Sequence, residues 1–515
     1  MHRRLFFSDL AKYAALAATT PTIWRLEWNP RYADDPFALG VASGDPTPDG
    51  AVLWTRLAPR PLEAEGGMDG RRVSVRWQVA EDEGFARITQ QGNATAAPEL
   101  GYSIHANVRG LHNDRWYFYR FTSGDAASAV GRLRTTPADG GESPLRFVSA
   151  SCSHYEEGLF TAYGHLATEE VDLVAHLGDY IYENAGLENR VRKHAGLEIQ
   201  TLDDYRRRYA QYKSDEHLRA AHARCPWLIV WDDHEVDNNY AGSIGENNIE
   251  SEEQMRARRA AAYQAWYEHM PVRVPRARSW ADLTIYRSAN WGRLARFWAL
   301  DTRQYRWDQA CGDGSRAIPC GDYADPNRTI LGDSQERWLL DGLRGSQSRW
   351  QVLAQQVGFA PPDEPVKAGD RVSMDTWQGY PLTRDRVCAA MGDAALGRAV
   401  VLTGDIHNNW VYDVRRGFDR TERPVIAAEF VATSISSGGD GGDNIARVND
   451  AYLAARPSLK WANNRRGYIL HAVTPTEWRA DYRVVPFVSR PGAPIQTASQ
   501  WRLKHGRPGV SRLGA

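Results

Sequence analysis

Four short segments of the sequence each follow an apolar run with side chains that can bind a metal or move a proton. They read SCSH, GDYIYE, DDHE and GDIHNN, and they follow the runs RFVSA, VDLVAHL, PWLIVW and AVVLT. One such ending carries little weight, because Asp and His after a strand commonly form turns or cap helices. Four of them within one region predict that the carboxyl ends of several strands meet at one site, where α/β proteins place their chemistry.

The candidate ligands in these segments form two sets that differ in chemical hardness. A thiol, a phenol and an imidazole suit a strongly Lewis-acidic ion such as Fe³⁺, whereas carboxylates alone suit Ca²⁺, Mg²⁺ or Mn²⁺. One aspartate, Asp179, can bridge both ions through its two oxygens. The softer set consists of Cys152, Tyr182 and His407, and the harder set consists of Asp233 and Asp405.

A pair of bound cations predicts hydrolysis of a phosphoester. Two cations about 3.5–4 Å apart generate hydroxide at neutral pH and clamp the oxygens of a phosphoryl group during in-line attack. No nucleophile from the protein is then required. His234, next to Asp233, remains as a non-ligand candidate that protonates the leaving alkoxide or hydrogen-bonds the phosphate.

The elements that position these residues change character near residue 144. Between Phe37 and Thr136 the chain shows short alternating runs such as VSVRWQV, which predict a small β-sandwich. The segment RTTPADGGESP is the polar boundary expected between two domains. Beyond it, apolar strand-like runs alternate with helix-like segments, which indicates an α/β domain.

Composition excludes several classes of protein. The chain has 515 residues, 42% of them hydrophobic and 25% charged, as in an ordinary globular protein of about two domains. A formal net charge of -1 provides no surface for nucleic acid. No run approaches the about 18 apolar residues that cross a bilayer, so we expect no transmembrane segment.

The N-terminus and the cysteines suggest export. MHRRLFFSDLAKYAALAATTP begins with paired arginines and reaches a small-x-small cleavage pattern, as in a twin-arginine signal. The alternative is an ordinary amphipathic helix, because Asp9 and Lys12 interrupt the apolar stretch. Cys311 and Cys320 flank a short loop and are predicted to form a disulfide if the protein leaves the cytosol. Cys225 and Cys388 have no evident role.

The order SCS, GDYIY, DDHE and GDIH resembles the motif series of metallophosphoesterases, and the substitutions are those of the PhoD-type alkaline phosphatase family. FALGVASGDPTPDGAVLWTRL, LDTRQYR, WQGYPLTR, EFVATSISSGG and RRGY extend the resemblance from about residue 37 to 468. It implies that Cys152, Asp179, Tyr182 and His407 bind iron. It also implies that Asp179, Asp233 and Asp405 face one or two calcium ions.

The same resemblance implies further site residues. The family has an amide after the strand WQVLAQ, so Gln355 or Gln356 is expected near the metals. Other candidates lie beside the motifs or in the additional matching segments and are predicted to contact phosphate or orient a ligand; these are Asn238, Asn408, Arg303 and Arg384. For the two asparagines a polar turn, and for the two arginines an ion pair, is the competing interpretation.

We therefore expect a secreted phosphatase that hydrolyses phosphomonoesters, and also diesters, by metal-activated hydroxide. The expected architecture is a lead-in over residues 1–36, an Ig/fibronectin III-like sandwich over 37–137, a four-layer αββα metallophosphatase domain over 145–490, and an extension over 491–515 that could act as a lid. Phosphodiesterase or phospholipase D activity at the same metals is the alternative. A non-catalytic protein that binds a surface polymer is the alternative from another class. The sequence leaves the oligomeric state open.

Overall fold

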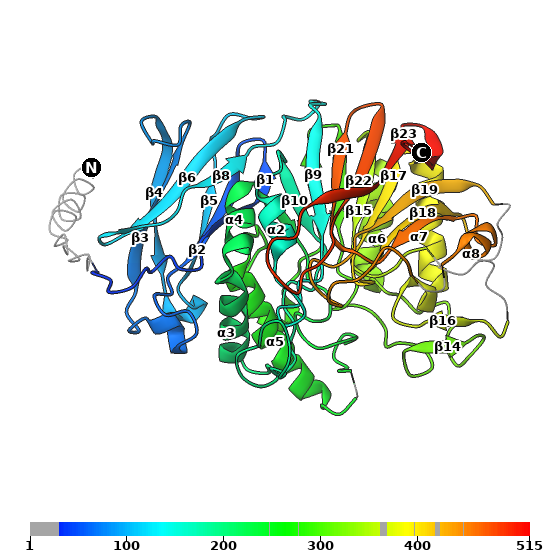
Figure 1. The fold of residues 1–515 in the computed structure, drawn as a ribbon, viewed down its shortest axis with the longest axis horizontal. Coiled ribbons are helices and arrows are strands. Elements are labelled where there is room, and N and C mark those ends of the chain that lie inside the picture. Colours follow the sequence, from blue (N-terminus) through cyan, green and yellow to red (C-terminus); the bar gives the residue numbers. More distant parts are fainter. Residues whose placement is uncertain are drawn as a thin grey trace, which may run out of the picture.

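The computed structural model describes residues 30–514, except 247, 277, 361–367, 396, 418–422 and 446–447. The predicted export signal, within residues 1–29, therefore lies outside the described residues. In the described part, two large sheets and a smaller one make up most of the molecule, and helices pack against both large sheets (Figure 1). The α/β class predicted from the alternating elements is confirmed.

The largest sheet has ten strands and runs through both regions that the sequence separates. Its central strands β9, β10, β11 and β1 are parallel, and the pairs on either side are antiparallel. Its order is β24 (Arg507–Arg512), β23 (Gln496–Lys504), β22 (Glu477–Val485), β21 (Arg466–Val473), β9 (Leu145–Ala150), β10 (Leu173–His176), β11 (Trp227–Ile229), β1 (Val41–Thr47), β2 (Gly50–Arg56) and β5 (Ser103–Val108).

The N-terminal region shares this sheet. β1 pairs with β11 in parallel, so that Gly44 lies opposite Trp227. A second, five-stranded sheet packs on β1, β2 and β5 through a hydrophobic core that includes Leu53, Val75 and Tyr119. It contains β4 (Ile88–Ala96), β3 (Val73–Ala80), β6 (Trp116–Ser123), β7 (Ala126–Ala127) and β8 (Gly131–Arg134). The two faces thus enclose a core, but one of them continues into the sheet of the larger region.

The other large sheet has seven strands and carries the second half of the chain. Its strands β13, β15, β17 and β19 are parallel, with antiparallel neighbours at both edges. The order is β12 (Arg287–Trp291), β13 (Ala295–Ala299), β15 (Trp350–Ala354), β17 (Ala399–Thr403), β19 (Val425–Val431), β18 (Asn409–Arg415) and β20 (Leu459–Asn463).

Side chains on the two faces of this sheet enter different cores. Val400 joins a core shared with the ten-stranded sheet, and its neighbour Val401 joins a core with two helices, α6 (Gly332–Gly345) and α7 (Pro381–Ala394). Successive side chains of a strand point to opposite faces, so a strand that is apolar throughout is buried on both sides. This explains the continuous apolar runs in the sequence.

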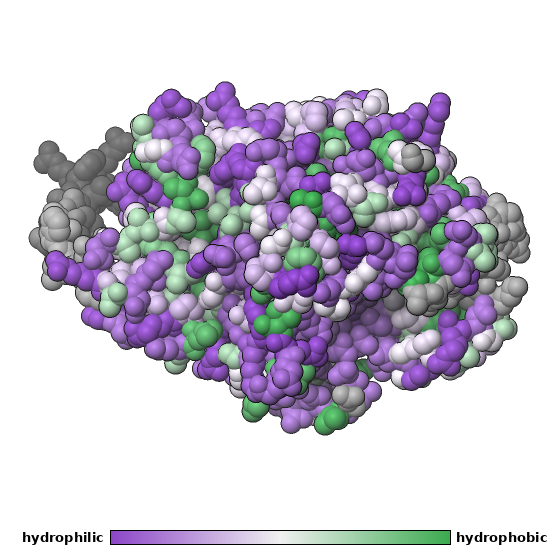
Figure 2. Space-filling view, viewed as in Figure 1, coloured by the Kyte–Doolittle hydropathy of each residue, from purple (hydrophilic) through white to green (hydrophobic). Residues whose placement is uncertain are grey.

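The remaining helices are α2 (Thr161–Leu166), α3 (Leu202–Lys213), α4 (Glu216–Arg224), α5 (Glu252–His269) and α8 (Asp450–Ala454), with short 3-10 turns at Ala64–Gly67, Pro98–Leu100, Trp280–Asp282 and Trp377–Gly379. α3 and α5 each begin with a capping box, made by Thr201 with Asp204 and by Ser251 with Gln254. Among the described helices, none has the length and hydrophobicity to cross a membrane. The surface in Figure 2 is mostly hydrophilic, with hydrophobic colour in small separate patches.

The structure also places the loop between Cys311 and Cys320 and the C-terminal extension. Cys311 and Cys320 form a disulfide beside the small sheet of β14 (Ser315–Ala317) and β16 (Arg371–Ser373). The extension over 491–515 contributes β23 and β24 to the edge of the ten-stranded sheet, where the main chain of Val510 donates a hydrogen bond of 2.8 Å to Asp413. This placement at the edge of a sheet does not support a role of the extension as a lid over the site.

Candidate metal centre and active site

The predicted ligands lie where parallel strands of both large sheets end. Cys152, Asp179 and Asp233 follow β9, β10 and β11 of the ten-stranded sheet, and Asp405 follows β17 of the seven-stranded sheet. A single parallel bridge between Ser151 and Ser434 joins the ends of the two sheets. Residues from two separate sheets therefore meet at one edge.

Two glycines permit this close approach. A Cβ on Gly178 would lie 2.5 Å from the Cβ of Asp232, and a Cβ on Gly404 would lie 2.9 Å from that of Ser151. The glycine of each Gly-Asp motif is thus needed because atoms of a neighbouring segment occupy the space of a side chain.

Four candidate ligands adopt the left-handed backbone conformation. The φ angle is 61° at Cys152, 52° at Asp179, 60° at Asp405 and 57° at His407. Such residues are uncommon outside glycine and cost of order 1–3 kcal/mol each when the surrounding structure imposes them. The sharp turn after each strand directs these side chains into one space, so the strain is concentrated at the candidate site.

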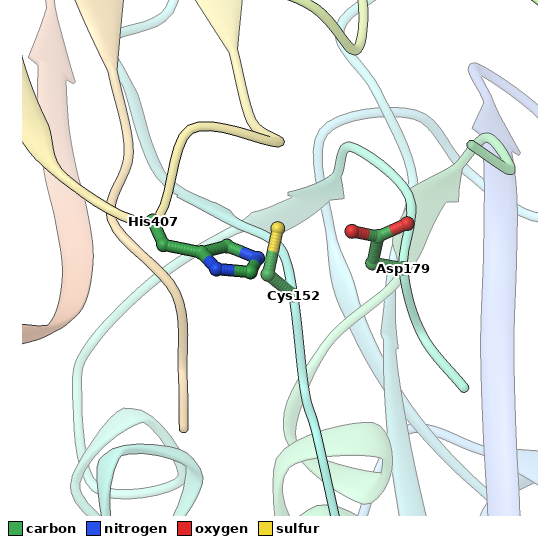
Figure 3. A group of neighbouring side chains, drawn as sticks. All are labelled: Cys152, Asp179 and His407. Atoms are coloured by element: carbon green, nitrogen blue, oxygen red, sulfur yellow. The ribbon is translucent and has the colours of Figure 1, made fainter. Parts of the chain in front are cut away.

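The ligand atoms form three overlapping clusters in which one atom of each residue lies within 4.8 Å of the others. They are Cys152, Asp179 and His407, then Asp179, Asp233 and His234, and finally Asp232, Asp233 and Asp405. Figure 3 shows the first cluster, whose three side chains approach one another from separate segments. Asp179 belongs to two clusters, as expected of a bridging ligand.

The phenol of Tyr182 lies at the centre of the softer set. Its hydroxyl is 3.1 Å from Oδ2 of Asp179, 3.1 Å from Nε2 of His407 and 2.7 Å from Oγ of Ser437. Burial, with the nearby Asp179, raises the pKa of this phenol and of the Cys152 thiol well above the usual values. A strongly Lewis-acidic cation would therefore be needed to hold either group in the deprotonated form that binds metal.

Arg303 is the buried cation of the harder set. Its guanidinium lies 2.7 Å from Asp375, 3.5 Å from Asp233 and 3.8 Å from Asp405, and it donates a 2.5 Å hydrogen bond to Asp232. Burial alone would raise the pKa of Asp233, but Arg303 and His234 lower it. Burial and the neighbouring carboxylates raise the pKa of Asp405. Arg306 also pairs with Asp375, at 2.6 Å, so two guanidinium groups face four carboxylates and leave this cluster short of positive charge.

The residues present fit a metal centre. Oδ1 of Asp179 and Oδ2 of Asp232 are buried and have no hydrogen-bond partner among the described residues. An unsatisfied buried acceptor costs about 1–3 kcal/mol, and more when it is charged. Cations would satisfy these oxygens and offset the excess negative charge.

His234 is oriented by a residue that the sequence reading did not single out. Its Nδ1 lies 2.7 Å from Oε2 of Glu183, and the imidazole rests 4.2 Å from the ring of Tyr182 between centroids. Burial alone would lower the pKa of His234, but Glu183, Asp233 and Asp179 raise it well above its usual value. The side chain stays 17% exposed, so its second nitrogen can meet a substrate.

The remaining candidates for phosphate contact or ligand orientation differ in how close they lie to the site and in their hydrogen-bond partners. Asn238 donates its main-chain N–H to Glu183 at 3.1 Å and so lies beside the His234 pair, whereas the side chain of Asn408 bonds its own turn at Ile406. The side chain of Gln355 bonds Thr403, Val357 and Trp377, and that of Gln356 bonds Leu300 and Thr302. Arg384 donates to the main chain of Phe359. The two glutamines and Arg384 thus have partners in the protein frame.

Several residues at the site have no role in the sequence interpretation. Glu235 accepts hydrogen bonds from the main chain of Asp179, Tyr180 and Asp232 and so ties two ligand loops together. Asp232 and Glu235 stand within the DDHE motif, so their positions carried a signal. Asp375 and Ser437 lie outside the four ligand motifs, Asp375 just before WQGYPLTR and Ser437 within EFVATSISSGG, and the fold brings both to the site.

Comparison with known proteins agrees with this geometry. The family model for PhoD-like phosphatase matches residues 147–482, and that for its N-terminal domain matches residues 22–137. The chain belongs to the PhoD-like phosphatase family. It is 46% identical to alkaline phosphatase D of Bacillus subtilis (strain 168) over 524 residues, covering 100% of this chain and 89% of that protein.

Solved structures place this PhoD-like phosphatase in the same group. A structure of PhoD aligns with a TM-score of 0.91 at 46% identity and covers 94% of each chain. A purple acid phosphatase from yellow lupin (Lupinus luteus) shares the fold, with a TM-score of 0.57 at 12% identity, over 92% of this chain and 74% of the other. The protein is a metal-dependent phosphoric ester hydrolase, which confirms the enzyme class expected from the sequence.

Proposed function

We propose that this enzyme hydrolyses phosphomonoesters, and also diesters, at a centre of Fe³⁺ and one or two Ca²⁺ ions. The observation that carries the proposal is the position of Asp179 between two donor sets of different hardness. Cys152, Tyr182 and His407 would hold Fe³⁺ together with Asp179, and Asp233 and Asp405 would complete the calcium site. When bound, the cations supply the Lewis acidity that activates water and offsets phosphoryl charge.

The chain's own residues have three tasks in this reaction. His234 donates a proton to the leaving oxygen, and Glu183, 2.7 Å away, orients the imidazole and stabilises its protonated form. Arg303 holds the carboxylates of Asp233 and Asp405 in place. The burial of Cys152 and Tyr182, which are 1% and 3% exposed, keeps bulk water from the softer set.

The same proposal covers the setting of the enzyme. The paired arginines near the N-terminus support export by the twin-arginine route, and the Cys311–Cys320 disulfide fits an oxidising compartment. The two faces of the N-terminal core support an Ig/fibronectin III-like sandwich over 37–137, and the shared core of two sheets with helices outside supports a four-layer αββα domain over 145–490.

A substrate panel tests the proposal. We expect metal-replete protein to hydrolyse nitrophenyl phosphate with a higher kcat/KM than bis-nitrophenyl phosphate or phosphatidylcholine. A preference for the diester or the lipid would keep the metal chemistry and replace the monoesterase by the phosphodiesterase or phospholipase D alternative. Hydrolysis no faster than that of His234→Ala on all three substrates would refute it.

A further inference from the structure

One histidine at the candidate site has no role in the reaction as described. His154 follows Cys152 by two positions, in the loop SCSHYEE after β9. Its ring lies 4.3 Å from that of Tyr182 and 5.3 Å from that of the buried His194, between centroids. These aromatic contacts therefore hold the ring of His154 in one place beside Tyr182, a member of the softer ligand set.

The backbone of this loop fixes the residue further. The main-chain N–H of His154 donates to Oγ of Ser437 at 3.2 Å, and its carbonyl accepts from Oγ of Ser436 at 2.8 Å. Ser437 also contacts the hydroxyl of Tyr182 at 2.7 Å. One serine thus links the main chain of His154 to the phenol of the proposed iron ligand.

The hydrogen bonding of the ring identifies its donor. Nδ1 of His154 accepts the main-chain N–H of Glu156 at 3.3 Å, so in the neutral imidazole the proton resides on Nε2. Among the described residues, Nε2 has no hydrogen-bond partner. The site therefore presents an oriented N–H donor that the protein itself does not use.

Exposure shows which side chains beside the ligands a substrate can contact. Cys152, Asp179 and Asp233 are buried, whereas His154, His234 and His407 are partly exposed. These three residues offer imidazole rings to a phosphoryl group that binds beside the buried ligands. Its oxygens are acceptors only, so the side chains that contact it must be donors or cations.

We propose that His154 is a substrate-binding residue whose Nε2–H donates a hydrogen bond to an oxygen of the bound phosphoryl group. The inference rests on the proposed function and adds to it a second histidine, separate from the proton donor His234. It assigns phosphate binding, and not proton transfer, to the loop after β9.

Two substitutions separate this role from simple packing. His154→Phe keeps a ring against Tyr182 and removes the donor, whereas His154→Gln removes the ring and keeps an N–H donor. His112→Phe, at an exposed histidine of the N-terminal region, is the control. The measurements are kcat and KM on nitrophenyl phosphate, and the Kd of inorganic phosphate by calorimetry on metal-replete protein. Metal content and the visible absorption of iron-loaded protein report on the integrity of the centre.

We expect His154→Phe to weaken phosphate binding and to lower kcat/KM by about 10- to 100-fold, as for one hydrogen bond to a charged group. Metal content and the visible band should stay unchanged, and His154→Gln should recover most of the phosphate affinity. Wild-type phosphate affinity in His154→Phe would overturn the inference, as would equal losses in both variants together with loss of metal. Wild-type protein that binds phosphate but hydrolyses no ester would contradict the proposed function alone.

Discussion

Replacing Glu183 by glutamine tests the proton-donor role of His234. Oε2 of Glu183 lies 2.7 Å from Nδ1 of His234, and Oε1 accepts the main-chain N–H of Asn238 at 3.1 Å. Glu183→Gln keeps the size of the side chain and an oxygen for Asn238, but it removes the charge beside the imidazole. The perturbation is therefore confined to the stabilisation of protonated His234.

The structure sets the size of the effect. Glu183 is 2% exposed, so solvent screens its bond to His234 little. A hydrogen bond to a charged group contributes about 1.5–3 kcal/mol, and each 1.36 kcal/mol changes a rate by a factor of ten. If this energy is expressed in the transition state, kcat/KM falls by roughly 10- to 150-fold in Glu183→Gln.

The assay compares two monoesters that differ in the leaving group. An alkyl phosphate needs a proton on its leaving oxygen, whereas nitrophenolate leaves readily without one, so the loss should be larger for the alkyl ester. Glu188→Gln, at a glutamate with a side chain 78% exposed, is the control and should retain wild-type rates. Equal losses on both esters, or none, would refute the assignment of His234 as proton donor to the leaving group.

Four further predictions concern the metals and the buried charges. Arg303→Met should lower the free energy of unfolding by about 3–5 kcal/mol, because the buried Asp232 loses its guanidinium partner while Asp375 keeps Arg306. Denaturant unfolding of the metal-free protein measures this, and a change under about 1 kcal/mol would contradict it. Tyr182→Phe should abolish the visible phenolate-to-iron band of iron-loaded protein. A calcium-selective chelator should remove activity reversibly while the colour persists. Bleaching by the same chelator would argue against two distinct sites. Burial lowers the pKa of Lys213 well below its usual value, so the unfolded state binds more protons and stability should rise with pH up to about 10.4. Lys213→Met should remove that part of the pH dependence of the melting temperature, and an unchanged profile would refute the explanation.

The candidate ligands could be proposed from the sequence because their motifs follow apolar strands; Asp179 and Tyr182 follow β10, and Asp405 and His407 follow β17. Apolar runs followed by Gly-Asp identify strand ends, and the hardness of Cys152, Tyr182 and Asp233 follows from their side chains alone. The sequence does not show which strand ends face each other. Asp405 belongs to a different sheet from Asp179, and the shared core of the two sheets, with the Ser151–Ser434 bridge, brings them together.

Long-range pairing explains what the sequence could not provide. Arg303 matches a phosphate-binding arginine by type, but four carboxylates from three separate segments surround it, and no local pattern records them. Likewise, the short runs between Phe37 and Thr136 predict strands without naming their partners, so the pairing of β1 with β11 was not foreseen. The sequence by itself determined the chemistry of each side chain and the class of each element. The tertiary structure decided which of them share one site, because strand pairing and burial of charge depend on residues distant in the chain.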